Sequence, residues 1–245
     1  SEFTVSFASN DLYEEFSSSE IIFNPDYDAN AINNDLAILF LDAPPPVFFD
    51  RYQIYRNSDE VGQNFNFVGF GKLGTGKSGA SVTVSNITDA KLQATNKFDV
   101  DGIGLQSEFD LNWSPTNVLF ADFDSGFLRN DAFGRLINLI DLGSGLSEGL
   151  IAPGDSGGPA FVDGQIAGIA SYVTTLSKPF IYPDYDRIEN NSTFGEVAAW
   201  QRVSSYQQWI DQSLRGNYSN APTTADEVKT MISEGSSGTA LTYFM

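Results

Sequence analysis

Short runs of alternating or consecutive apolar residues recur along the whole chain. They are rich in β-branched and aromatic residues and are separated by Gly, Asn, Asp and Pro, which is the pattern of short β-strands joined by turns. Many such strands predict an all-β sandwich or barrel. The predicted strands lie at residues 3–9, 36–41, 65–71, 80–86, 158–162 and 165–173.

The clearest helical pattern comes late, at residues 203–216, "VSSYQQWIDQSLRG". A serine can cap its first turn, and Gly216 can end it. Its apolar residues recur near helical spacing: Tyr206, Trp209, Ile210 and Leu214. The pattern predicts one helix after the last strand of the domain.

Composition narrows the function classes. Thirteen basic residues against 32 acidic ones give a net charge of −19, which argues against nucleic acid or an anionic membrane as the partner. No apolar run approaches the roughly 18 residues that a membrane-spanning helix needs. With no cysteine and no histidine there is neither a disulfide nor a thiolate or imidazole metal site, so we expect no metal and no cofactor in catalysis.

A glycine-rich stretch at residues 71–78, "GKLGTGKS", matches the letters of a phosphate-binding loop. Such a loop needs a helix directly after it, because the helix N-terminus completes the phosphate cradle. Residues 80–86 instead alternate with period two, which is typical of a strand. The sequence therefore favours a glycine-rich hairpin over a nucleotide site.

The stretch "GDSGGP", residues 154–159, fits a nucleophilic serine. A serine nucleophile needs an exposed hydroxyl, a base and N–H donors for the oxyanion that forms. Gly154 lets the backbone bend so that its own N–H and that of Ser156 can serve as those donors. Gly157 and Gly158 leave room for a substrate backbone.

These residues resemble the nucleophile motif of the trypsin-like serine proteases, which have the chymotrypsin fold. Residues 24–44, "NPDYDANAINNDLAILFLDAP", resemble the segment that carries the aspartate of that family, at Asp35. Residues 164–173 and 200–210 resemble the strand beside the substrate and the closing strand with its C-terminal helix. The resemblance covers residues 1 to about 215.

The resemblance implies a two-barrel fold with an incomplete first barrel at residues 1–50 and a second barrel with its closing helix at 51–215. It implies a secreted serine endopeptidase that acts on polypeptides without a cofactor. Ser156 would attack the peptide carbonyl, and Asp35 would orient a histidine. Ser171 would support Asp35 from the neighbouring strand.

The triad histidine of the family precedes a segment like residues 3–12, so we expect it upstream of Ser1. The first strands would lie there too, with the new N-terminus that pairs with the aspartate matched by Asp155 in activated members. The chain without the histidine should have negligible peptidase activity. The alternative is a protease fold that has lost its histidine and serves as a binding module.

The predicted substrate-binding residues depart from trypsin. The pocket-floor position that is aspartate in trypsin falls on Leu150, which leaves no countercharge for Lys or Arg. Val173 and Ala198 match wall positions that are glycine in relatives with wide pockets. We therefore expect cleavage after small or medium apolar residues. The remaining predicted contacts come from the strand beside the substrate, at Ser171 and Tyr172.

One further region is interpreted from its acidic composition. Asp122, Asp124 and Asp131 offer oxygens that suit Ca²⁺, but spacing alone favours a solvated acidic loop.

Residues 216–225 are polar and predict a linker to other domains of a larger protein. Residues 226–245 resemble the first strand of a Calx-beta module, with a strand that folds back onto the protease as the alternative.

Overall fold

The computed structural model of the chain describes residues 3–9, 12–29, 32–82, 91–106, 108–109 and 117–217. They fall into two compact units, and each is described by itself. The first unit takes residues from Ser1–Pro25, Leu36–Tyr52 and the segment that begins at Tyr206. The second takes residues from Asp26–Asp35 and Gln53–Ser205.

The first unit is built on an antiparallel sheet of β1 (Phe3–Ser9), β2 (Leu12–Phe23) and β3 (Ala37–Leu41). Alternation along β3 buries Ile38 and Phe40 while their neighbours stay half-buried. The strands therefore present one apolar face, as the period of two predicts.

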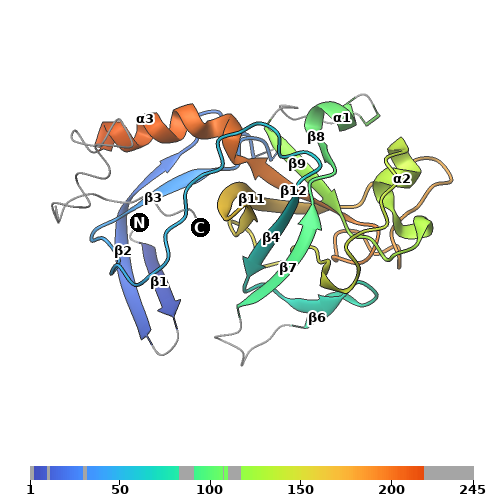
Figure 1. The fold of residues 1–245 in the computed structure, drawn as a ribbon, viewed down its shortest axis with the longest axis horizontal. Helices are drawn as coiled ribbons and strands as arrows, with labels where there is room; N and C mark the ends of the chain where they lie inside the picture. The colour runs from blue at the N-terminus through green and yellow to red at the C-terminus, as the bar shows by residue number, and fades with distance from the viewer. Residues whose placement is uncertain are drawn as a thin grey trace. The chain divides into compact units, whose positions relative to one another are not determined.

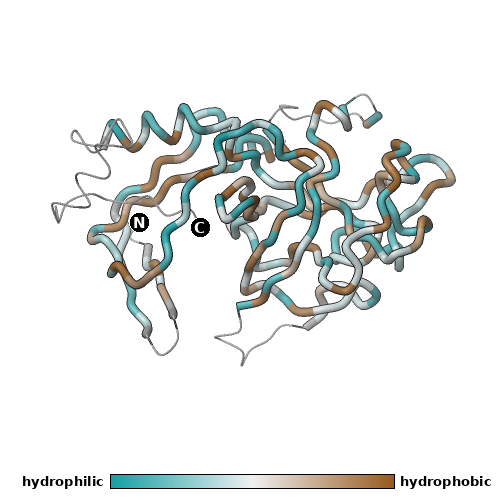
Figure 2. Tube along the Cα trace, viewed as in Figure 1, coloured by the Kyte–Doolittle hydropathy of each residue, from teal (hydrophilic) through white to brown (hydrophobic). Residues whose placement is uncertain are grey.

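The helix α3 (Gln207–Asn217) belongs to the first unit and follows a 3₁₀ turn at Val203–Tyr206. The predicted helix is thus present, with its first turn wound more tightly than an α-helix. Apolar and polar residues alternate around α3, as the brown and teal bands of Figure 2 show, and Ile210 is buried. This is the pattern of a helix with one apolar face.

The second unit is built on a curled sheet of seven antiparallel strands, counted within its described residues (Figure 1). Its strand order departs from chain order because β9 returns beside β12 rather than beside β7. In sheet order the strands are β7 (Leu92–Lys97), β4 (Asn64–Gly69), β10 (Pro159–Val162), β11 (Gln165–Thr174), β12 (Val197–Arg202), β9 (Val118–Asp122) and β8 (Val100–Asp101).

Both faces of this sheet are covered by apolar residues. Successive residues of β12 alternate between the two cores, since Ala198 and Trp200 pack into one and Val197 and Ala199 into the other. The first core also holds Phe65, Phe67 and Phe98. Strands buried on both faces have continuous apolar runs, which matches "VAAW" at residues 197–200 of β12.

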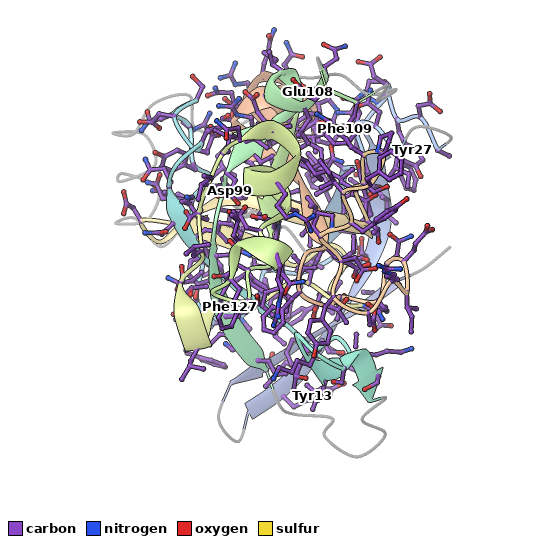
Figure 3. The ribbon with its side chains drawn as sticks, turned by 90° about the vertical axis from the view of Figure 1, so that its right-hand side faces the viewer. Tyr13, Tyr27, Asp99, Glu108, Phe109 and Phe127 are labelled. Atoms are coloured by element: carbon purple, nitrogen blue, oxygen red, sulfur yellow. The ribbon has the colours of Figure 1, made fainter. Side chains whose placement is uncertain are left out.

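Two short helices cover the outer face of the sheet. They are α1 (Gly102–Gln106) and α2 (Ala132–Ile137), and they contribute Leu105, Phe133 and Leu136 to the second core. Lys178 bridges the two helices. Its ammonium contacts Glu108, just after α1, and donates to the carbonyl of Leu136 in α2 at 2.7 Å. Glu108 and Phe109 are labelled beside one another in Figure 3, and Lys178 lies over the Phe109 ring.

The all-β fold class predicted from the sequence is confirmed, with a helix after the last strand of the sheet. The glycine-rich stretch at 71–78 forms the hairpin of β5 (Leu73–Thr75) and β6 (Gly79–Val82). The first two residues of the predicted linker belong to α3, and the rest of the linker, with the Calx-beta-like strand, lies outside the described residues from residue 218 onward. No helix in the described part of the chain is long and apolar enough to cross a membrane.

The first core supplies a test of this packing. Phe98 is fully buried and stacks on Phe65 with 4.1 Å between ring centroids. We expect Phe98→Ala to lower the free energy of unfolding by about 3–5 kcal/mol, because a cavity replaces the ring. Phe180→Ala is the matched control, since Phe180 is 95% exposed, and it should change stability by less than about 0.5 kcal/mol. Urea unfolding measures both, and equal losses would contradict this description of the core.

Candidate active site

The stretch at residues 154–159 forms a tight turn that leads into β10. Gly154 and Gly157 have φ angles of +104° and +83°, in the region that favours glycine. Ser156 lies between them and is exposed. The backbone of this turn is therefore specified by its glycines.

The N–H groups of the turn divide into two sets. In the first set, the N–H of Asp155 donates to the Ala152 carbonyl and the N–H of Gly157 donates to the Ala170 carbonyl. The N–H of Gly158 donates to the Asp155 carbonyl, and all three bonds are 2.8–2.9 Å long. Within the described residues, no acceptor meets the N–H of Gly154 or the N–H and hydroxyl of Ser156. The groups expected to act on a substrate are thus the ones that the turn leaves available.

Asp155 fixes the turn from within. Its Oδ1 accepts the N–H of Gly71 at 2.7 Å, and its Oδ2 accepts the N–H of Ala152 at 2.8 Å. A Cβ at Gly69 or Gly71 would lie 2.0 Å or 2.6 Å from Asp155 Oδ1. Gly71, the first residue of the apparent phosphate loop, and Gly69 just before it therefore make room for this carboxylate.

Asp35 is held by a short chain of hydrogen bonds. Ser171 Oγ donates to Asp35 Oδ2 at 2.7 Å, and Gln201 Nε2 donates to Ser171 Oγ at 3.3 Å. The register between β11 and β12 shifts between Ala170 and Tyr172, so Ser171 occupies a β-bulge. A bulge redirects a side chain out of the regular alternation, which accounts for its reach toward Asp35.

The structure connects the nucleophile turn to Asp35 through β11. The N–H of Gly157 donates to the Ala170 carbonyl at 2.8 Å, and Ala170 directly precedes Ser171. Ser156 and Asp35 are therefore anchored to adjacent residues of one strand. The sequence analysis did not predict a role for Gln201. The signal that could have indicated it is a polar glutamine in β12, a strand that is buried along its whole length.

Three of the predicted pocket residues come together. Val173 and Ala198 are direct cross-strand partners in β11 and β12. Leu150 and Val173 pack against the core cluster that contains Ala198. Tyr172 instead packs against the cluster on the other face, where burial raises the pKa of its hydroxyl. The structure therefore separates Tyr172 from the other three side chains.

Glu196 organises the loop beside these residues and was also missed. It is fully buried, and its carboxylate accepts the N–H groups of residues 190–193 and the hydroxyl of Thr175. Burial raises the pKa of Glu196, and the hydrogen bonds oppose that rise. Ser192 Oγ in turn donates to the Ile151 carbonyl at 2.8 Å, next to Leu150.

The expectation of a solvated acidic loop is wrong for its three aspartates. Asp122, Asp124 and Asp131 are only 1%, 6% and 0% exposed. Asp122 ends β9, and Asp131 caps α2 by accepting the N–H of Gly134. The packing of α2 against the sheet is what buries them.

Comparison with known proteins gives a partial similarity. Two proteins of Corynebacterium glutamicum are each 34% identical to this chain over 65 residues. The one from strain R is named "Uncharacterized peptidase", and the one from strain ATCC 13032 is also named a peptidase, provisionally. The matched segment is 26% of this chain and 19% of either relative. No family model matches the chain.

These relatives indicate a peptidase-like function at most. Their names carry no information on the catalytic type. The site itself contains an exposed serine, two N–H groups without acceptors and an oriented carboxylate. The chain contains no histidine to serve as the base of that serine.

The close contact between Gly71 and Asp155 can be tested by Gly71→Ala. The new Cβ would lie 2.6 Å from Cγ, Oδ1 and Oδ2 of Asp155, so the carboxylate must move and lose its bond to the Gly71 N–H. We expect a loss of about 1–3 kcal/mol in the free energy of unfolding, measured in urea.

Gly216→Ala is the control, because nothing lies within 4 Å of a Cβ at that helical position. It should leave stability unchanged or raise it by up to about 1 kcal/mol, as alanine favours a helix. A Gly71→Ala variant as stable as the control would contradict the role assigned to Asp155.

Proposed function

We propose that the protein is a serine endopeptidase of the trypsin-like type. The observation that carries this proposal is the division of N–H groups at the turn, which leaves those of Gly154 and Ser156 without acceptors. The bond from Ser171 to Asp35 and the partial similarity to proteins named peptidases support it.

In this mechanism Ser156 Oγ attacks the carbonyl carbon of the scissile peptide bond. A histidine takes the serine proton and then passes it to the leaving amine. The N–H groups of Gly154 and Ser156 stabilise the oxyanion of the tetrahedral intermediate. Asp35 holds the histidine in the productive tautomer, and Ser171 and Gln201 hold Asp35.

The histidine of this proposal precedes Ser1 in a longer protein. The chain alone would then retain the oxyanion donors and the nucleophile but not the base. Loss of a triad member leaves only about 10³–10⁴-fold acceleration over water. Secretion and further domains of the longer protein are part of the same proposal.

A binding module is the second candidate, because 245 residues contain no histidine. In that case the fold and the turn persist while the chemistry is lost. The two candidates share every structural feature described above. They differ in whether Ser156 becomes nucleophilic when the preceding sequence is present.

Fluorophosphonate labelling tests the nucleophile. We expect the chain extended through its preceding sequence to be labelled at Ser156, with labelling abolished in Ser156→Ala. The chain that begins at Ser1 should be labelled at least about 10³-fold more slowly, because no base activates its serine. Mass spectrometry of the labelled peptide identifies the residue.

Circular dichroism of each protein is the folding control for this comparison. An extended protein that is folded, contains a histidine and leaves Ser156 unlabelled would favour the binding module over the peptidase.

The pocket assignment is tested separately, in the extended active protein. We expect cleavage after small or medium apolar residues, because Leu150 provides no countercharge for a buried ammonium. Leu150→Asp should raise kcat/KM for Lys or Arg relative to an apolar residue by roughly tenfold or more. Leu146→Asp, at a fully exposed position, is the control and should change nothing. A wild-type preference for Lys or Arg would contradict the assignment of Leu150.

A further inference from the structure

Three aspartates converge in the second unit, away from the turn that carries Ser156. Asp122, Asp124 and Asp131 each offer a carboxylate oxygen, and these oxygens lie within 4.8 Å of one another. They come from the end of β9, from the loop that follows it and from the N-cap of α2. All three side chains are more than nine-tenths buried.

Further carboxylates adjoin this cluster. Asp99, labelled in Figure 3, accepts the N–H of Asp122 at 3.3 Å. Glu148 accepts the N–H of Asp124 at 2.7 Å, and the N–H of Asp141 donates to Asp131 at 3.2 Å. The negative charge of the region is therefore larger than that of the three aspartates alone.

Positive charge does not balance these groups within the described residues. The ammonium of Lys97 lies 3.2 Å from Asp99 and also contacts Asp141. The ammonium of Lys97 thus contacts two of the six carboxylates.

Asp124 also carries an unused acceptor. Its Oδ1 is buried and has no hydrogen-bond partner, and the residue is 6% exposed. By contrast, Asp122 accepts the N–H of Phe133 at 3.0 Å, and Asp131 accepts the N–H of Gly134 at 2.5 Å. A buried, ionised carboxylate oxygen without a donor is strongly destabilising, and either protonation or a bound cation relieves that cost.

We propose that Asp122, Asp124 and Asp131 bind one Ca²⁺ ion, with Oδ1 of Asp124 as a direct ligand. Ca²⁺ takes six to eight oxygen ligands at about 2.3–2.6 Å, so ligands around one ion lie within about 5 Å of one another. One carboxylate oxygen from each of the three aspartates lies within 4.8 Å of the others, which fits that geometry. Mg²⁺ demands a smaller octahedral site and keeps several of its waters, which suits a buried cluster of carboxylates less well.

The ion would hold two neighbouring elements of the chain together. It would link the end of β9 to the start of α2 and reduce the net negative charge next to Glu148 and Asp99. Glu148 lies two residues before Leu150, on the segment that leads to the nucleophile turn. The site is therefore a structural one, and its effect should be seen in stability without any assay of catalysis.

Isothermal titration of the metal-free chain with CaCl₂ and with MgCl₂ tests the proposal. We expect one Ca²⁺ per chain, bound more tightly than Mg²⁺. At Ca²⁺ one hundred times its Kd, Tm should rise by roughly 5–10 °C above its value in EDTA. Asp124→Asn should weaken Ca²⁺ binding at least about tenfold and remove most of that rise.

The variant also separates the ion from ordinary destabilisation. In EDTA, Asp124→Asn should be as stable as the unchanged chain or more stable, because it relieves repulsion among carboxylates. Glu189→Gln is the control, since it removes the same charge from an exposed position of the same unit and should bind Ca²⁺ like the unchanged chain.

Three results would overturn the proposal. The first is an unchanged chain that shows neither heat nor a rise in Tm with Ca²⁺ up to about 5 mM. The second is Mg²⁺ bound as tightly as Ca²⁺, and the third is an Asp124→Asn variant that keeps the full Ca²⁺ affinity. The titration of the unchanged chain decides the question even if the variant does not fold.

Discussion

The two hydrogen bonds that the Asp155 carboxylate accepts from backbone N–H groups are the constraint on which the candidate active site depends. They join the turn to Gly71 on one side and to Ala152 on the other. With the carboxylate in this place, the peptide groups on either side of Asp155 are fixed, and the N–H groups of Gly154 and Ser156 remain without acceptors. A half-buried carboxylate whose two oxygens both accept backbone N–H groups can hold such a conformation.

The strand β11 carries this constraint to the other half of the site. Its Ala170 receives the N–H of Gly157, and the bulge at Ser171 turns the next side chain toward Asp35. The extra residue also resets the alternation, so that Ala170 and Val173 face the same core. One irregular residue thus directs Ser171 toward Asp35 and places Val173 on the same core as Ala170.

Local patterns predicted much of this architecture, and features that depend on distant residues were not predictable. Alternation indicated β4 and β11, and the missing helix after the glycine-rich stretch indicated a hairpin. A bulge at Ser171 has no local signal, because it arises from the register against β12. The charge of Asp124 predicted a solvated side chain. Its burial depends on residues distant in sequence, such as Glu148, and could not be predicted locally. The polar strand β7 offered no apolar pattern at all.

One rule of physical chemistry connects the carboxylates of the second unit: a buried charge needs compensation. Asp155 obtains it from two N–H groups, and Glu196 obtains it from four N–H groups and a hydroxyl. Both carboxylates thereby shape a loop next to the candidate site. Asp155 is half-buried, whereas Asp124 is only 6% exposed and has an oxygen without any donor and several acidic neighbours. Backbone N–H groups thus compensate the carboxylates of Asp155 and Glu196 but not Oδ1 of Asp124. The proposed Ca²⁺ ion would compensate that oxygen.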